Sequence, residues 1–373
     1  MALPLPLYSG RLVDRWGAKP VVLAAQVLQA VGFAGYVIFS GPVAIFVVAT
    51  VASLGRGVFW SAIFTLLSGL ADGDPDPRAR ERWFGVTGAL RAAGYGLGAV
   101  LAGVALSVDS GTFYRWLIAA NAAALAFAAV LVVIGARGTR AATAPESTAG
   151  RGYRTLLRDR PYLALISVNT VFALCNLLLS VGFPVYAARS LPGARWAVGP
   201  LLGLNTVVQA LCLPFVVRLA RRIRRDVSLC LAAGFWAAWG LATLSARHVP
   251  AVLAVPFCTL AILCYSTAQM LHSPTSNAIA ADSAPVDLRG RYLASFQYSF
   301  AIATVIAPTL FATLLGVGAD LPWVFVCLAA LGTIPALLIL APRLPAGALT
   351  GIPAGVVPAG GVHGVSAVPR RVR

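Results

Sequence analysis

The stretch Gly10-Arg11-Leu12-Val13-Asp14-Arg15-Trp16-Gly17-Ala18-Lys19-Pro20 is short and charged, and it stands between two apolar segments. It carries three basic residues, one carboxylate and two glycines, and the apolar run 21–39 follows at once. Glycine permits a sharp reversal of the backbone and a close approach of the helices beside it. The pattern therefore predicts a hairpin between two membrane helices, with its positive charges facing water.

The composition places the rest of the chain in a membrane. Of its residues 59% are hydrophobic and only 11% are charged. Apolar runs of about 20 residues recur, and at about 1.5 Å per residue a helix of that length crosses the hydrocarbon core. The hydropathy pattern predicts ten full spans, at 20–39, 42–70, 83–107, 114–135, 162–188, 197–217, 227–246, 249–280, 292–318 and 322–341. We expect an all-α membrane protein, because lipid leaves unpaired backbone groups without partners.

The basic residues lie mostly on one side of these spans. The formal net charge is +17, and 23 of the 29 Lys and Arg fall in loops on one side of the predicted topology. Four lie on the other side, and Arg56 and Arg91 lie inside spans. Cytoplasmic loops carry an excess of Lys and Arg, so the pattern predicts a multi-pass protein of the inner (plasma) membrane. Its central loop and C-terminus are expected in the cytoplasm, and no nucleic acid partner is needed to explain the charge.

Two distant segments share an order of features. The first segment contains Asp72, then a proline, then Arg82 followed by an aromatic residue. The second contains Asp282, then a proline, then Arg291 followed by a tyrosine, at an offset of about 210 residues. Transporters are commonly built from such internal repeats, so the offset predicts two duplicated bundles. The predicted organisation is an N-terminal bundle at 1–136, a cytoplasmic linker at 137–160, a C-terminal bundle at 161–341 and a disordered cytoplasmic tail at 342–373.

The same offset predicts that the N-terminal bundle is incomplete. The second bundle begins near Pro161, so its counterpart in the first would begin about 50 residues before Met1. We therefore expect helix 1 and most of helix 2 to be missing, with residues 1–9 as the tail of helix 2. A misassigned start and a true truncation both remain open.

Several kinds of active site are absent from the sequence. It has no His-Glu-x-x-His, no Gly-x-Ser-x-Gly and no Gly-x-x-x-x-Gly-Lys-Ser/Thr motif. The six cysteines lie in apolar spans without Cys-x-x-Cys spacing, which is typical of small core residues. We expect no enzyme, no metal and no cofactor, and a function powered by an ion gradient or by the substrate's own gradient.

Three motifs resemble those of one transporter family. Gly10, Asp14, Arg15, Gly17 and Lys19 are in register with Gly-x-x-x-Asp-Arg-x-Gly-Arg-Lys/Arg, the loop between helices 2 and 3 of the major facilitator superfamily, while Ala18 departs from it. The segment 54–62, with Arg56 in mid-membrane, resembles the helix-4 motif of that superfamily. The glycines of the segment 94–103 resemble the helix-5 motif of its drug/proton antiporters, although two alanines depart from it. These glycines are Gly94, Gly98 and Gly103.

This resemblance implies a fold and a function. The implied fold has two pseudo-symmetric six-helix bundles, here without helix 1 and most of helix 2. The implied function is proton-coupled efflux of small apolar or cationic compounds by alternating access, by a monomer in the lipid bilayer that uses a proton gradient. An uptake system or a sugar or metabolite carrier of the same superfamily is an alternative, and so is an inactive fragment. By the same resemblance, Asp14 and Arg15 hold the cytoplasmic ends of the bundles together and contact the segment 289–292.

Charged and polar residues within spans are candidates for the transport site. A guanidinium in mid-membrane costs about 3 kcal/mol or more unless it is paired or hydrated, so Arg56 should face the bundle interior. We expect a role for it in transport or coupling, with a purely structural pair as the alternative. Arg91 is a similar candidate, or it snorkels to the cytoplasm. No Asp or Glu lies deep in a span, so a proton-carrying carboxylate would lie in the missing first helices, or another group carries the proton. His272 is the candidate for that group, with a hydrogen bond to a neighbouring helix as its alternative role.

The remaining candidates are polar or aromatic residues on spans of both halves. Each amide among them is otherwise explained as a hydrogen bond between helices. The expected cavity-lining residues are Trp60, Asn169, Asn205, Gln209, Gln269, Asn277 and Gln297.

Overall fold

The computed structural model describes residues 5–76, 78–108, 111–135, 152–191 and 196–350. Within these residues the chain is helical and has no strand. The first half contains α1 (Leu5–Trp16), α2 (Ala18–Ile38), α3 (Pro42–Asp72), α4 (Ala79–Val108) and α5 (Gly111–Gly135), and α6 (Gly152–Arg158) follows. The second half contains α7 (Arg160–Val181), α8 (Phe183–Ser190), α9 (Val198–Ala220), α10 (Arg225–Ser245), α11 (Ala251–Ser283), η3 (Val286–Leu288), α12 (Arg289–Phe296), α13 (Tyr298–Val317), α14 (Leu321–Leu340), η4 (Ala341–Arg343) and α15 (Ala346–Thr350).

The predicted spans correspond to long helices. Nine segments of the described chain are long and apolar enough to cross a membrane. The one remaining predicted span, 83–107, falls in the 30-residue helix α4. Part of this span lies outside the residues whose side chains are described. The chain is therefore an all-α, multi-pass membrane protein.

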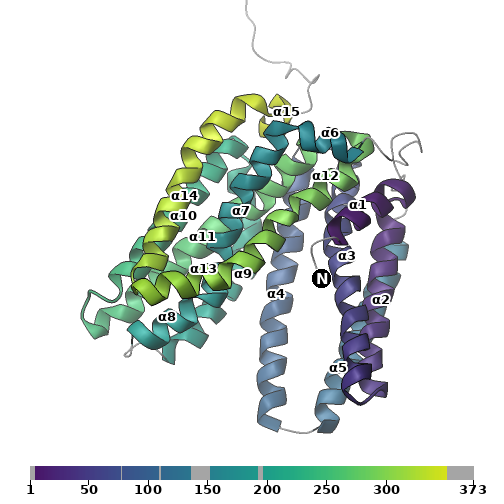
Figure 1. Cartoon of the computed structure of the whole chain (residues 1–373), viewed down its shortest axis with the longest axis horizontal. Coiled ribbons are helices and arrows are strands. Elements are labelled where there is room, and N and C mark those ends of the chain that lie inside the picture. Colours follow the sequence, from purple (N-terminus) through teal and green to yellow (C-terminus); the bar gives the residue numbers. More distant parts are fainter. Residues whose placement is uncertain (1–4, 77, 109–110, 136–151, 192–195, 351–373) are drawn as a thin grey trace, which may run out of the picture.

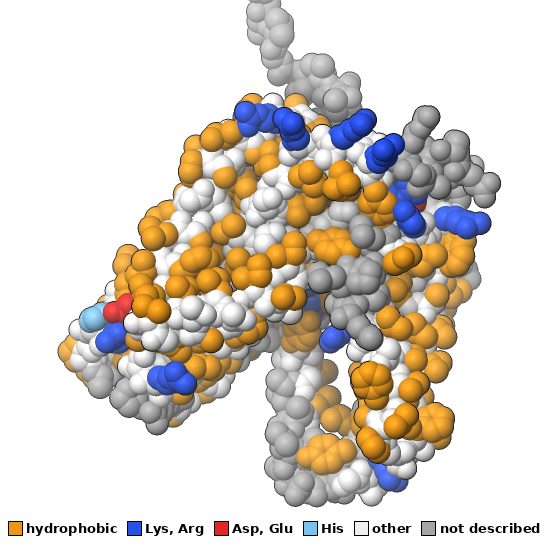
Figure 2. Space-filling model, in the orientation of Figure 1, with side chains coloured by type: hydrophobic (Ala, Val, Ile, Leu, Met, Phe, Trp, Pro, Cys, Tyr) orange, Lys and Arg blue, Asp and Glu red, His pale blue; other side chains and the backbone are white. Residues whose placement is uncertain are grey.

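The two halves meet at one end and separate at the other (Figure 1). Helix α2 packs on α3 and α5, while in the second half α10 packs on α11 and α14, and α7 packs on α13. The end where α1, α6, α12 and α15 lie is here named the basic end, because Lys and Arg side chains gather along it (Figure 2). The opposite end is named the open end. Apolar side chains cover the flanks between the two ends, as expected for surfaces in contact with lipid.

Helix α4 belongs to the first half, but it packs mainly on α9 and α11 of the second half. Glycines allow this approach, since a Cβ atom at Gly85 would lie 2.8 Å from Val217 Cγ2. A Cβ atom at Gly88 would lie 2.9 Å from Leu213 Cδ2, on the same face of α9. Small residues let helix backbones come close in membranes, and here they join the halves.

The packed core is larger in the second half. Its main cluster includes Trp236, Trp239 and Trp323, whose side chains are fully buried. The corresponding cluster of the first half is small and centres on Val22 and Ala62. The second half therefore supplies the more rigid wall of the interface between the halves.

Two sequence-based expectations about local structure change, and the predicted linker includes a short helix. The charged stretch was expected to be a turn, but α1 runs through it to Trp16, and the chain turns only at Gly17, whose φ is 85°. The linker 137–160 contains the helix α6, and its residues 137–151 lie outside the described part. The tail was expected to be disordered from 342, but α15 packs through buried Ala348 and Leu349, since apolar side chains there find a pocket on α10 and α11. Residues 351–373 lie outside the described part.

Candidate functional site: a cavity between the halves and its closed end

A cavity of about 990 Å³ lies between the two halves. Its walls come from α3 and α4 on one side, from α7, α9 and α11 on the other, and from the segment 297–304 at the start of α13. The space-filling view shows a cleft between the halves that opens away from the basic end (Figure 2). The volume suits a small organic molecule, for which pockets usually measure about 300–1,000 Å³.

Two arginines provide the formal charge of this cavity. Arg56 on α3 and Arg91 on α4 both line it, and the side chain of Arg56 is exposed there. The Cζ atom of Arg91 lies 5.5 Å from the centroid of the Trp60 ring, a cation–π contact worth about 0.5–1 kcal/mol at an exposed site. Arg56 forms no ion pair with a described residue, and no described lining residue is acidic. The described lining therefore carries two positive charges and no negative one.

Most of the predicted amides reach the cavity wall. Asn205 and Gln209 on α9 line it, and the Asn205 Oδ1 atom accepts from Gln209 Nε2 at 2.8 Å and from Ser266 Oγ at 2.9 Å. Gln269 on α11 also lines it and accepts a hydrogen bond from Asn176 of α7. These side chains join α7, α9 and α11 to one another while their surfaces face the cavity, so each acts both between helices and as lining.

Two amides on the wall keep a polar atom without a partner. Asn277 on α11 donates from Nδ2 to the Ser273 carbonyl at 2.7 Å, but its Oδ1 has no hydrogen-bond partner among the described residues. The Nε2 atom of Gln297 likewise has none. Both atoms are enclosed at the cavity wall, so a rotation of the side chain would be needed to present either of them to a ligand in the cavity.

His272 and Asn169 lie elsewhere. The His272 Nε2 and Asn169 Oδ1 atoms are 2.8 Å apart, and Asn169 also donates to Ser299 Oγ at 2.6 Å. The imidazole packs on the rings of Phe172 and Trp236, at centroid distances of 4.8 and 5.1 Å, and only 1% of His272 is exposed. Neither residue lines the cavity. Their position favours the alternative, a hydrogen bond between helices in the core, over a role in proton transfer.

The helix-5 glycines differ from the glycines that join α4 to α9. A Cβ atom at Gly94 or Gly98 would meet no described atom within 4 Å. Gly103 lies in α4, but its surroundings are outside the described residues. Close helix approaches on α4 occur instead at Gly85, Gly88 and Gly96.

Asp14 closes the cavity at the basic end. Its carboxylate lies 3.0 Å from Arg291 Nε, and it accepts hydrogen bonds from the backbone N–H groups of Gly290 and Arg291 at the start of α12. Only glycine fits at 290, because a Cβ atom there would collide with Asp14 Oδ1. Burial raises the pKa of Asp14 to about 7, although Arg291 acts in the opposite direction. The contact expected between Asp14 and the segment 289–292 is therefore present.

The other residues of the charged stretch set the path of the chain. Gly10 lets α1 cross α12 closely, since a Cβ atom there would lie 3.1 Å from Ala294 Cβ. Gly17 provides the positive φ at which α1 ends. Lys19 Nζ donates to the Val133 carbonyl at 3.0 Å and so ties α2 to the end of α5. Arg15 is exposed at the end of α1.

The repeated segments exchange partners across the interface. Asp72 of the first half pairs with Arg289 of the second at 2.5 Å, and Asp282 of the second half pairs with Arg80 of the first. Arg80 also pairs with Asp72, so the two exchanged pairs are joined. The duplicated aspartates, 210 residues apart, therefore occupy equivalent positions in an interlocked set of ion pairs.

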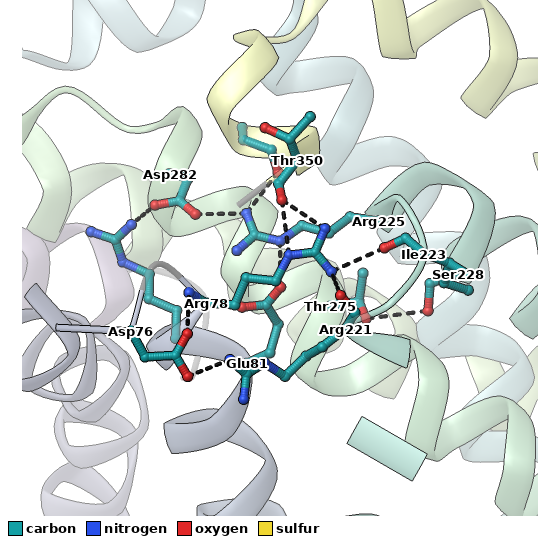
Figure 3. A network of polar contacts seen from close by, with 12 residues as sticks. Asp76, Arg78, Glu81, Arg221, Ile223, Arg225, Ser228, Thr275, Asp282 and Thr350 are labelled. Atoms are coloured by element: carbon teal, nitrogen blue, oxygen red, sulfur yellow. Dashed lines mark hydrogen bonds and ion pairs between the residues drawn. The ribbon is translucent and has the colours of Figure 1, made fainter. Parts of the chain in front are cut away.

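A second set of polar contacts lies beside the first (Figure 3). Arg225 at the start of α10 is 2% exposed; it pairs with Glu81 at 2.8 Å and with Asp282 at 2.6 Å, and donates to the Ala348 carbonyl at 2.7 Å. Arg78 donates from Nε to the Thr350 carbonyl at 2.9 Å. The segment that contains α15 thus takes part in holding the halves together.

Sequence reasoning treated most of these basic residues only as topology markers. It identified Asp72 and Asp282 as repeat positions but assigned them no contact, it used Arg225 only as a topology marker, and it gave Glu81 no role. The repeat could have indicated these contacts, because equivalent charged residues of two facing halves lie close together where the halves meet.

The chain resembles known transporters in sequence and in fold. The family model of the Major Facilitator Superfamily matches residues 1–308. The multidrug resistance protein MdtH of Edwardsiella ictaluri is 22% identical over 308 residues, which are 82% of this chain and 72% of that protein. MdtH of Aeromonas hydrophila is 22% identical over 299 residues, 80% of this chain and 71% of the relative.

Two solved structures share the fold. The human organic anion transporter MFSD10 superposes with a TM-score of 0.64 at 16% identity, covering 91% of this chain and 79% of that one. The Escherichia coli fucose:proton symporter FucP gives the same TM-score and identity, with 91% and 87% covered. The family match extends over most of the chain, and the duplicated bundles and the central cavity agree with it, so this chain belongs to the Major Facilitator Superfamily.

Proposed function

We propose that this chain is an efflux carrier that works by alternating access and couples the export of small, largely apolar molecules to proton entry. One observation carries the proposal: a cavity between duplicated halves is open at one end and closed by interlocked ion pairs at the other. Rocking of the halves about such a site would expose it to each side in turn. The relatives named multidrug resistance proteins support efflux over uptake.

The charge distribution supports an orientation for this carrier. The basic end bears the loops that are rich in Lys and Arg, so the positive-inside rule places it in the cytoplasm. The structure then corresponds to an outward-open state in the inner membrane, with Asp14 and its neighbours as the closed cytoplasmic gate. A cysteine introduced at Ser147 should be labelled only from the cytoplasm, and one at Ser190 only from outside. Labelling of both from one side would contradict this orientation.

The position of ionisable groups bears on coupling. Arg56 and Arg91 reach the cavity and His272 does not, so we propose that the two arginines bind the substrate there. Asp14 titrates near neutrality at the gate and is the proposed group through which proton binding favours the closed cytoplasmic end. The carrier is proposed to act as a monomer, since each chain contains both walls of its cavity.

Transport in liposomes tests this function. The purified chain is reconstituted, a pH gradient is imposed, and the movement of a neutral radiolabelled aromatic compound is followed with and without an ionophore that collapses the gradient. A protein-dependent flux that the ionophore abolishes is the expected result. A flux indifferent to the gradient would remove the proton coupling, and no flux above protein-free liposomes would favour the inactive alternative.

A further inference from the structure

The described lining of the cavity is positively charged. Two guanidinium groups line it, and none of its described lining residues is Asp or Glu. The acidic residues that the structure describes lie in loops or near helix ends. Among the described residues, therefore, no carboxylate lies beside the two arginines of the cavity.

One guanidinium contacts the Trp60 ring, and the other is carried by the same helix face as Trp60. Arg56 and Trp60 are four residues apart on α3, so their side chains lie on the same face of that helix. Arg91 approaches the same Trp60 ring from α4, with its Cζ atom 5.5 Å from the centroid. A planar group bound beside Trp60 would be within reach of both cations, and Arg presents its donors in a fork that matches a carboxylate or sulfonate.

The rest of the cavity suits an apolar body with polar attachments. Its other aromatic lining residues include Phe64, Tyr95 and Phe300, which offer faces for an aromatic or aliphatic group. The Gln297 Nε2 donor has no hydrogen-bond partner among the described residues and provides a further donor. The polar part of the wall thus combines two cations with donor and acceptor groups, the Asn277 Oδ1 acceptor included.

We propose that the cavity binds organic anions, with an acidic group held by Arg56 and Arg91 and an aromatic or aliphatic body against the apolar wall. This inference rests on the proposed carrier function and names its substrate class. It replaces the expectation of cationic substrates, because a cation would enter a site with two like charges and no carboxylate to bind it. Neither guanidinium has a carboxylate partner among the described residues, and the acidic group of the ligand supplies one.

Three ligands with the same body and different charge test the proposal. Naphthylacetate, naphthylacetamide and naphthylethylammonium are titrated calorimetrically into the full chain in lipid nanodiscs at pH 7, with empty nanodiscs subtracted. We expect the anion to bind about tenfold more tightly than the amide or better, since hydrogen bonds to a charged group exceed neutral ones by about that factor. The cation should bind more weakly than the amide. Equal binding of the three, tighter binding of the cation or no binding of the anion would overturn the proposal.

Matched variants identify the residues responsible. Arg56→Gln and Arg91→Gln should each remove most of the preference for the anion over the amide, while Arg56→Lys should keep part of it. Arg189→Gln removes the same charge at an exposed position outside the cavity and should leave the preference unchanged. A preference that survives both cavity variants would overturn the assignment. If Arg56→Gln fails to fold, Arg91→Gln still decides the outcome.

The failure of this inference differs from the failure of the proposed function. Binding is measured at equilibrium without a gradient, so a chain that prefers the anion but moves nothing in liposomes would support the binding site and contradict the carrier. A chain that transports but prefers the cation would support the carrier and contradict the anion site.

Discussion

The basic end and the cavity both contain arginines, but they use them differently. At the basic end Arg225 and Arg291 are buried, and each pairs with a carboxylate from the other half. In the cavity Arg56 is exposed and has no ion pair with a described residue. Charges that pair across the interface stabilise one arrangement of the halves, whereas an unpaired charge in the cavity is free to bind a ligand. The loss of an arginine should therefore lower the stability of the protein much more at the basic end than in the cavity.

The largest effect is expected from Arg225→Ala. The substitution leaves Glu81, which is 4% exposed, without its partner, and breaking a buried pair costs about 3–5 kcal/mol. Chemical unfolding in detergent, followed by tryptophan fluorescence, measures this loss. The neighbouring Arg224→Ala is the control, because the Arg224 side chain is 60% exposed and its partner Asp226 belongs to the same half. Equal unfolding of the two variants would mean that the buried set does not hold the halves together.

A smaller and asymmetric effect is expected from the duplicated aspartates. Asp282→Asn should weaken the closed end by about 1–3 kcal/mol, because that carboxylate is well buried and pairs with both Arg80 and Arg225. Asp72→Asn should cost about 0–1 kcal/mol, since 44% of its side chain is exposed. Spin-label distances between α1 and α12 report the fraction of molecules that remain closed. A greater opening in Asp72→Asn would reverse the proposed ranking.

The closed end should also depend on pH through Asp14. Burial on α12 raises its pKa from 3.8 to about 7, with Arg291 lowering the pKa and Asp287 raising it. The buried arrangement therefore holds a proton that a hydrated Asp14 releases, so its stabilisation is complete below pH 3.8 and is lost as the pH rises through about 7.

Because Asp14 binds one proton, the titration of this residue limits how steeply the closed fraction can change with pH. The closed fraction should fall by at most about tenfold per pH unit between pH 5 and 7. The same spin-label distances, recorded against pH, measure it. Asp14→Asn should flatten the profile, whereas a profile unchanged in that variant would assign the titration to another group.

The smallest effect on stability is expected at the cavity. Arg56→Ala removes a side chain that has no ion pair with a described residue, so the free energy of unfolding should change by less than about 0.5 kcal/mol. Chemical unfolding under the conditions used for Arg225→Ala gives the comparison. A loss as large as that of Arg225→Ala would show that Arg56 is a structural residue and would end the contrast between the two regions.

The helix α11 shows how far sequence alone could identify the site. Gln269, Ser273 and Asn277, spaced by four residues, all line the cavity, while His272 between them points into the aromatic core. In a span that is apolar all round, hydrophobic periodicity does not separate the face toward a cavity from the face toward another helix. The polarity of Gln269 and Asn277 was thus a correct indication of lining, and the same argument failed to distinguish His272 and Asn169.

The sequence by itself determined the fold class, the duplication and the basic end, because span length, repeat offset and loop charge are properties of the chain read in order. It also identified the contact of Asp14 with the segment 289–292 through a motif. Only the tertiary structure decided that Asp72 and Asp282 exchange partners, that α15 packs on the closed end, and that Arg91 of α4 contacts the Trp60 ring of α3. These arrangements join residues that are far apart in sequence. Their energy depends on how the surfaces of different helices pack together, and the sequence of a single segment does not determine that packing.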